Sequence, residues 1–213
     1  AINMVYGAAA AGARVLTSSS SPGIALKQEG IGYISNAGLP AVIINMMRGG
    51  PGLGTIQPGQ ADYNMTVKGG ANGDYHNVVL APASVQEAVN MVMEAFDIAD
   101  QYLLPVIILA DGLIGQMMEP VEFNYVPRPN LPEKTWALVG HYGAERSNIK
   151  NLVIEPDECE AWNHDHFKVY DEVYCREFRL LIGTVDEACR YLKRLEWGDK
   201  RIREVREASK QAD

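Results

Sequence analysis

Four short apolar runs constrain the fold of this 213-residue chain more than any other feature. They lie at residues 14–19, 41–47, 77–81 and 105–111, are rich in valine and isoleucine, and close near serine, glycine, proline or aspartate. Runs of this length and composition are typical of β-strands. Because they are apolar almost throughout, we expect both faces of each strand to be covered, as in a parallel sheet.

The segments between these runs favour helices. Residues 24–36 and part of residues 57–67 have helical patterns, and the clearest pattern covers residues 84–102. Ser84 is expected to cap this last helix, with Glu87 at the spacing of a capping box. Helices that alternate with apolar strands predict an α/β fold, in which a mostly parallel sheet is sandwiched by helices.

The density of charge divides the chain. Residues 1–125 contain 4 Lys or Arg and 10 Asp or Glu, whereas residues 126–213 contain 15 and 17. Three prolines mark a linker-like stretch at residues 123–132. We therefore predict an α/β domain at 1–125, followed at 126–213 by a linker and a polar, partly helical C-terminal extension. Residues 184–213 have an amphipathic helical pattern that is interrupted at Gly198.

Composition excludes several classes of partner. The net charge of -8 and the pI near 5.1 argue against a nucleic-acid partner, because phosphate binding needs a clustered positive field. No apolar run reaches the roughly 18 residues of a membrane-spanning helix. Cys159, Cys175 and Cys189 form no C-x-x-C motif, which fits a reducing, cytoplasmic location. The chain starts inside a helical pattern without an initiator Met, so we expect the original chain to begin earlier.

Arg48 is one of the few cations in the first half of the chain, and it directly follows the apolar run at 41–47. In an open parallel sheet, ligands bind beyond the carboxyl ends of the strands. A guanidinium there holds a carboxylate or phosphate through two parallel N–H bonds, and the glycines of the following "GGPGLG" allow close approach. The alternative is a structural ion pair with Asp62 or Asp111. The sequence leaves both interpretations open.

A second strand end carries "TSSSSPG" at residues 17–23. Free N–H groups at the start of a helix, together with small hydroxyl side chains, suit a polar or anionic ligand. An ordinary helix-capping run explains the same residues. The glycine-rich stretch at 49–54 matches neither G-x-G-x-x-G nor a Walker loop, so a nucleotide-binding fingerprint is absent.

Four further polar residues are weaker candidates. His164 and His166 would meet on a strand, but no Cys or carboxylate completes a ligand set, so a solvated segment is the simpler interpretation and we expect no metal site. His76 follows a glycine-rich loop and either lines a pocket or is an ordinary loop residue. Glu29 is expected on the surface of the helix after the serines, or behind the site as a supporting group.

At this point a family resemblance becomes visible. The order of helix, "AGARVLTSSSSPG", helix and "GLPAVIINMMRGGPG" resembles the pyrimidine-binding domain of thiamine diphosphate enzymes. The longer strings "RGGPGLGTIQPGQADY" and "PVIILADGLIGQMMEPV" resemble the alpha subunit of 2-oxoacid:ferredoxin oxidoreductases, and most closely the branched-chain, 2-oxoisovalerate type. The resemblance covers residues 1–125 strongly and residues 126–175 moderately.

The resemblance implies an activity and a set of site residues. The activity is oxidative decarboxylation of a 2-oxoacid with coenzyme A, which gives an acyl-CoA, carbon dioxide and reduced ferredoxin. Arg48 matches the family arginine that contacts the substrate carboxylate. The turn at 18–23 matches the loop near the aminopyrimidine of thiamine diphosphate, which implies cofactor contacts from Ser19, Ser20, Ser21, Pro22 and Gly23.

The resemblance also implies partners. Thiamine diphosphate would be shared with a beta subunit that binds it, and Mg²⁺ and the iron–sulfur clusters would lie on partner chains, including gamma and ferredoxin-like subunits. Two departures stand against a complete match. The family's glutamate that bonds the aminopyrimidine, and a Thr-containing substrate loop, would lie before the start of this chain. Near residue 182 the chain enters a helical pattern where family members continue into a second α/β domain.

Three functional hypotheses remain. The first is a catalytic subunit that contributes half of a composite active site. The second is a structural or regulatory subunit of such a complex that has lost the glutamate. The third, a nucleotide-binding Rossmann module, is disfavoured by the missing glycine fingerprint.

Overall fold

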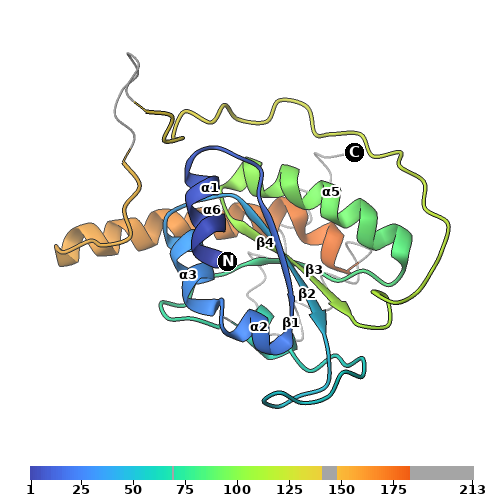
Figure 1. The fold of residues 1–213 in the computed structure, drawn as a ribbon. Helices are drawn as coiled ribbons and strands as arrows, with labels where there is room; N and C mark the ends of the chain where they lie inside the picture. Colours follow the sequence, from blue (N-terminus) through green and yellow to red (C-terminus); the bar gives the residue numbers. More distant parts are fainter. Residues whose placement is uncertain (69, 141–147, 183–213) are drawn as a thin grey trace, which may run out of the picture. The chain divides into compact units, whose positions relative to one another are not determined.

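A computed structural model describes residues 1–68, 70–140 and 148–182 of the chain (Figure 1). The chain divides into two compact units, Ala1–Leu152 and Val153–Asp213. The first unit holds the sheet and the helices around it, so it is the unit that carries the predicted site.

The described part of the first unit forms a four-stranded sheet in the order β1-β2-β4-β3. All neighbouring strands are parallel, as the apolar runs predicted. Since the strands run the same way, their carboxyl ends meet at one edge of the sheet, where Ser20, Met47 and Asp111 lie. The strands are β1 (Leu16–Ser20), β2 (Ala41–Met47), β3 (Val78–Leu80) and β4 (Pro105–Asp111).

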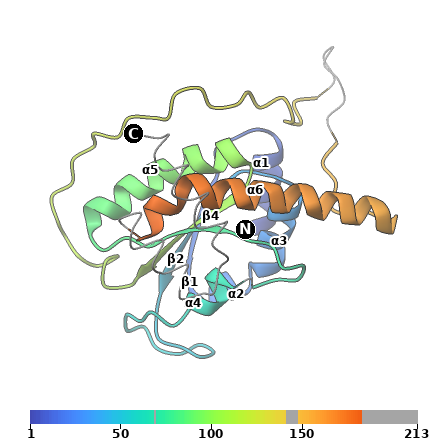
Figure 2. The same ribbon diagram turned by 180° about the vertical axis from the view of Figure 1, so that it is seen from behind.

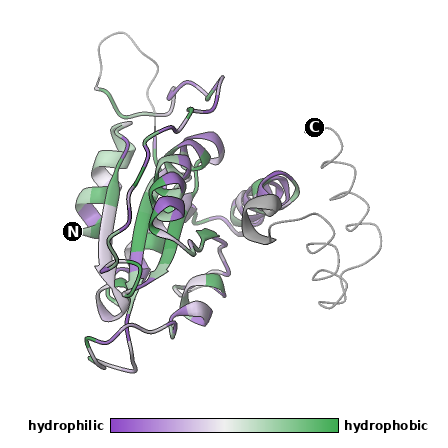
Figure 3. Ribbon diagram, turned by 90° about the vertical axis from the view of Figure 1, so that its right-hand side faces the viewer, coloured by the Kyte–Doolittle hydropathy of each residue, from purple (hydrophilic) through white to green (hydrophobic). Residues whose placement is uncertain are grey.

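Helices lie on both faces of this sheet, and the hydrophobic strands are enclosed between them (Figure 3). On one face, Ile43 and Ile107 from neighbouring strands pack with Ile24, Ile31 and Tyr75. This enclosure explains why β2 and β4 are apolar along most of their length, and it confirms the predicted α/β fold. The helices of the first unit are α1 (Ile2–Ala10), α2 (Ser21–Ala25), α3 (Gln28–Asn36), α4 (Tyr63–Val67) and α5 (Val85–Tyr102).

The predicted start of α5 is confirmed. The Ser84 hydroxyl accepts a hydrogen bond from the Glu87 N–H at 3.1 Å, which is the expected capping contact. The Glu87 carboxylate accepts in turn from the N–H of Ala83 at 2.8 Å, one residue before the cap. Together these bonds satisfy backbone donors that the first turn of a helix cannot pair internally.

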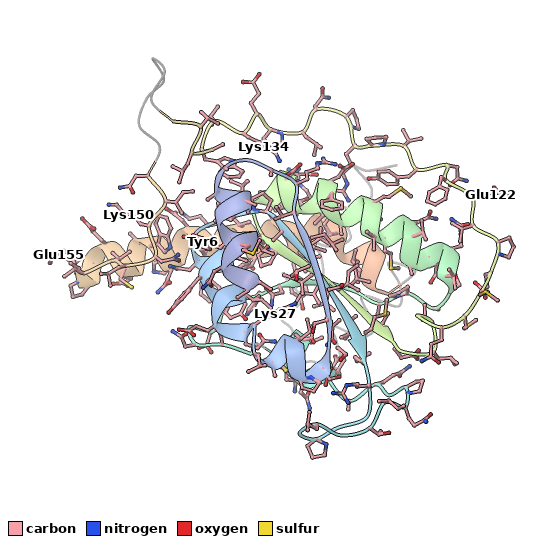
Figure 4. All side chains as sticks on the ribbon, in the orientation of Figure 1. Tyr6, Lys27, Glu122, Lys134, Lys150 and Glu155 are labelled. Carbon is pink, nitrogen blue, oxygen red and sulfur yellow. The ribbon has the colours of Figure 1, made fainter. Side chains whose placement is uncertain are left out.

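The helical pattern predicted for residues 24–36 is confirmed over Gln28–Asn36, but residues 24 and 25 belong to a separate, preceding helix. The structure has two helices, α2 and α3, separated at Leu26 and Lys27. The Lys27 N–H bonds to the Ile24 carbonyl, which tightens the last turn of α2. The Lys27 side chain (Figure 4) bonds to the Thr17 hydroxyl at 3.0 Å and the Ser18 carbonyl at 3.1 Å on β1. The residue at the break between the two helices is therefore bonded to β1.

The proline-rich stretch packs against α5 within the first unit. The extended chain after β4 passes along α5 in both views (Figures 1 and 2). Tyr125 donates to Asp97 of α5 at 2.7 Å, and Lys134 pairs with Asp100 at 3.0 Å. The Leu138 N–H then bonds to the Ala10 carbonyl at the end of α1. These contacts explain why the compact units divide after Leu152, later than the change in charge density near residue 125.

The second unit contains α6 (Pro156–Ile182). His164 and His166 lie on this helix, not on the strand on which their two-residue spacing would have brought them together. The predicted amphipathic helix at 184–213 lies outside the described residues. No helix in the described ranges is long and apolar enough to cross a membrane.

Candidate active site

Arg48 lies immediately after β2, at the carboxyl edge of the sheet, and its side chain is half-buried. Its Nε donates to the Ser20 hydroxyl at 3.2 Å. Its Nη1 donates to the carbonyl oxygens of Leu53 and, at 2.9 Å, of Thr55. The guanidinium therefore joins the end of β1 to the loop that follows β2.

The backbone of Arg48 is held as well. Its N–H donates to the Ser21 hydroxyl at 3.0 Å, and the same hydroxyl donates to the Arg48 carbonyl at 3.3 Å. Ser21 is 8% exposed, so water competes little for this pair of bonds. The two strand ends that the sequence singled out separately thus meet directly.

No salt bridge joins Arg48 to a carboxylate within the described ranges. Asp62 accepts instead from Asn45 at 3.0 Å, and Asp111 accepts from Gln60 at 3.1 Å. The structural ion pair that the sequence left open as an alternative is therefore not formed with either aspartate. Within the described ranges, the hydrogen-bond partners of the guanidinium are all neutral.

The loop after β2 is folded back on itself. The Gly49 N–H bonds to the Gln57 carbonyl at 3.0 Å, and the Thr55 N–H bonds to the Gly49 carbonyl at 2.8 Å. Gly54 has φ +58°, and a Cβ there would collide with the Gly49 carbonyl oxygen. This turn requires glycine, and it places the two carbonyls that bind Arg48.

The serine turn is compact. Ser20 is the N-cap of α2 in an extended conformation, and Pro22 occupies the first turn. A Cβ on Gly23 would collide with the Ser19 hydroxyl, so glycine allows the strand and helix to approach. Because α2 has only five residues, this turn offers hydroxyls and backbone groups rather than the field of a long helix.

Asp111, at the end of β4, anchors the far side of the loop. Its carboxylate accepts from the Gln60 side chain at 3.1 Å and from the N–H groups of Ile114 and Leu113 at 3.0 and 2.9 Å. The Gln60 bond first, and then the Ile114 bond, hold the pKa of Asp111 below its ordinary value. Asp111 thus stays ionised and keeps the loop fixed at both ends.

Asn45 was not among the site residues predicted from the sequence. This residue is fully buried on β2, and its amide nitrogen donates to Asp62 at 3.0 Å. Its Oδ1 has no hydrogen-bond partner in the part of the chain that the structure describes. The available signal was a single amide inside the otherwise apolar run AVIINMM, because a buried polar group normally requires a partner.

The weaker candidates lie away from Arg48. His76 precedes β3, so it lies toward the amino edge of the parallel sheet, opposite to the edge that carries Arg48. Glu29 is exposed on α3 and accepts from the Tyr33 hydroxyl at 2.8 Å. His164 faces Glu160 at 3.6 Å, and His166 bonds to the backbone carbonyl one turn earlier at 2.9 Å. Residues two apart on a helix point in different directions, so the two histidines are not brought together.

Comparison with known protein families decides the relationship. Residues 1–146 match the family model described as pyruvate flavodoxin/ferredoxin oxidoreductase, thiamine diphosphate-binding. The chain belongs to this family. The matched range includes the whole sheet and every residue that contacts Arg48.

Curated relatives support this assignment. The ketoisovalerate oxidoreductase subunit VorB of Methanothermobacter thermautotrophicus is 48% identical over 88% of this chain and 53% of its own length. The 2-oxoglutarate synthase subunit KorA of Archaeoglobus fulgidus is 46% identical over 56% of this chain and 35% of its own. The chain thus spans about half the length of the VorB relatives that it matches, or less for KorA.

A solved structure has a similar fold. The 2-oxoglutarate:ferredoxin oxidoreductase from Magnetococcus marinus, with 2-oxoglutarate, coenzyme A and succinyl-CoA bound, superposes with a TM-score of 0.62 at 23% identity. The match covers 81% of this chain and 35% of that one. At this level of identity, the likeness establishes the parallel α/β architecture.

Proposed function

We propose that this chain forms part of a 2-oxoacid:ferredoxin oxidoreductase, in which it supplies the pyrimidine-binding side of a composite active site. The reaction breaks the bond between C1 and C2 of a 2-oxoacid. Carbon dioxide leaves, the acyl group joins the sulfur of coenzyme A, and two electrons pass to ferredoxin while one proton is released. Family membership and the VorB and KorA relatives support this assignment.

The observation that carries the proposal is the state of Arg48. Its guanidinium lies at the carboxyl edge of a parallel sheet, where ligands of such folds bind. Within the described ranges it has neutral hydrogen-bond partners and no carboxylate. A fixed cation without an anionic partner attracts a carboxylate more strongly than one already paired. We assign Arg48 the binding of the substrate carboxylate.

We further propose a branched-chain substrate such as 2-oxoisovalerate. The relatives named for ketoisovalerate match 88% of this chain, whereas the KorA relative from Archaeoglobus fulgidus matches 56%.

The site suits a neutral ring beside a carboxylate. Hydroxyls and backbone groups of the turn, Ser19 to Gly23, lie next to Arg48 and carry no charge, which fits the aminopyrimidine end of thiamine diphosphate. When bound, this cofactor supplies the carbanion chemistry. Arg48 holds the substrate acid, and the Ser21 bonds keep the strand end rigid. The diphosphate, Mg²⁺ and iron–sulfur clusters are assigned to beta, gamma and ferredoxin-like partner subunits of a cytoplasmic complex.

The alternative is a structural or regulatory subunit of the same complex. In that role the chain would supply the fold and the partner-binding surfaces of the complex, and none of its side chains would be needed for turnover. The two proposals differ in whether turnover depends on Arg48.

The test uses the complete complex, purified anaerobically with its partner subunits. Reduction of a viologen dye by 2-oxoisovalerate and coenzyme A is measured for wild type, Arg48→Ala and Arg48→Lys. The control is Arg176→Ala, which removes an exposed arginine that pairs with Glu172 on α6. Arg48→Ala removes the charged contact with the substrate carboxylate and should lower kcat/KM about 30- to 1000-fold. Full activity of both Arg48 variants would instead favour the structural subunit.

A further inference from the structure

The serine turn and Arg48 are connected by more bonds than capping of α2 requires. The caps of short helices satisfy backbone N–H groups. In this turn, however, the Ser20 side chain makes no capping bond within α2. Its hydroxyl accepts from Arg48 Nε, 28 positions later in the chain. The serine is therefore used for a tertiary contact.

The bonds around the guanidinium fix its orientation. Nε is held by Ser20, and Nη1 is held by the carbonyls of Leu53 and Thr55. A planar group fixed on two of its edges cannot rotate about its own axis without breaking one set of bonds. Nη2 has no protein partner in the described ranges, so it is the nitrogen left for an incoming ligand.

This arrangement differs from the two parallel N–H bonds to a carboxylate or phosphate that the sequence led us to expect from Arg48. A bidentate contact needs two adjacent N–H groups on different nitrogens. In the structure, Nε and Nη1 both have acceptors, which leaves only the two hydrogens of Nη2 unengaged. The direction in which Nη2 points is set by Ser20 on one side and by the loop after β2 on the other.

We propose that Ser20 is a positioning residue, which orients the Arg48 guanidinium for the substrate carboxylate. Ser21 also helps to position Arg48, because its buried hydroxyl bonds to both the backbone N–H and the backbone carbonyl of Arg48. This inference rests on the proposed function. It differs from a cofactor contact, since the acceptor lone pair of the Ser20 hydroxyl is directed at Arg48.

The inference makes a specific prediction for the complete complex. Ser20→Ala removes the acceptor for Nε and should raise KM for 2-oxoisovalerate about 5- to 30-fold, with the KM for coenzyme A unchanged. Ser20→Thr keeps the hydroxyl and should stay within about 2-fold of wild type. Ser20→Cys is a second variant of similar size with a weak acceptor, and it should behave as Ser20→Ala does.

A double-mutant cycle tests whether Ser20 acts through Arg48 or acts directly on the substrate. Lysine has no Nε, so Ser20→Ala should add nothing in an Arg48→Lys background. The control is Ser84→Ala, which removes a capping hydroxyl of α5 and should leave KM unchanged. Additive effects of the two substitutions, or unchanged KM in both Ser20→Ala and Ser20→Cys, would overturn the inference.

The outcomes for the two proposals are distinct. If Arg48→Lys is impaired while the Ser20 variants are not, Arg48 binds the acid without help from the turn, and the proposed function stands. If Arg48→Lys and Arg48→Ala are both fully active, the assigned role of Arg48 fails, and the positioning role fails with it.

Discussion

Asp97 of α5 accepts a hydrogen bond at 2.7 Å from the hydroxyl of Tyr125, a residue in the proline-rich stretch after β4. The same carboxylate accepts from the N–H of Arg128 at 2.8 Å and pairs with Arg14 at 2.7 Å. Asp97 has no exposed surface. One buried acid therefore holds together three segments that are distant in the sequence.

Replacing Asp97 should destabilise the first unit. Asp97→Ala leaves the Arg128 N–H and the Tyr125 hydroxyl without their acceptor and removes one partner of Arg14. We expect a loss of about 2–4 kcal/mol in the free energy of unfolding, toward the low end because Arg14 is 43% exposed. Urea unfolding followed by circular dichroism measures this loss. The control Asp165→Ala breaks an exposed ion pair with Lys168 and should leave the unfolding midpoint unchanged.

The same residue should make stability depend on pH. Burial by itself would raise the pKa of Asp97, but the bonds from Arg128, Tyr125 and Arg14 more than offset this, so the pKa lies below the usual 3.8. A lowered folded-state pKa gives stability that is complete above the pKa of the unfolded chain and is lost as pH falls through the folded value. Between about pH 5 and pH 2, wild type should therefore lose more unfolding free energy than Asp97→Asn. Parallel curves for the two proteins would contradict this assignment.

The cap of α5 provides a local test. Ser84→Ala removes the acceptor for the Glu87 N–H and should lower the unfolding free energy by about 1 kcal/mol. Ser84→Asp keeps an acceptor at the N-terminus and should retain most of the stability. Ser18→Ala, at an exposed position of β1, is the control for loss of a hydroxyl. Equal effects of Ser84→Ala and Ser84→Asp would show that the cap contributes little.

Two helix glycines should respond in opposite directions. Gly7 of α1 has nothing within 4 Å of an added Cβ, so Gly7→Ala should stabilise by about 0.5–1 kcal/mol. Gly30 of α3 is buried, and an added Cβ would lie 2.5 Å from Cγ1 of Ile2. Gly30→Ala should therefore destabilise by about 1–3 kcal/mol as the two helices are forced apart. Thermal unfolding of the two variants measures both changes in stability. A stabilising effect of Gly30→Ala would contradict the packing of α1 on α3.

The elements that were predicted well are those whose pattern is local. The bounds of β2 and β4 agree with the apolar runs, because a short apolar run bounded by turn residues can be recognised from its own sequence. The Ser84 cap was predicted for the same reason. The break between α2 and α3 was not predicted, and Lys27 at this break bonds to residues of β1 that lie 9 and 10 positions earlier.

The candidate site shows the same difference between local sequence features and tertiary contacts. Its position at a strand end, its arginine and its serine turn were visible as separate local features. Their direct connection was not, and neither was the burial of Asn45 against Asp62. These contacts join residues 17 to 28 positions apart, and they depend on which strands become neighbours.

The sequence alone determined a parallel α/β fold with a lone arginine at a strand end, because hydrophobic periodicity and glycine placement act over a few neighbouring residues. The tertiary structure decided what that arginine contacts. Strand order brings the end of β1 beside the end of β2 and folds the glycine loop back over them. Only then do two serines and two carbonyls surround Arg48 and leave one nitrogen open.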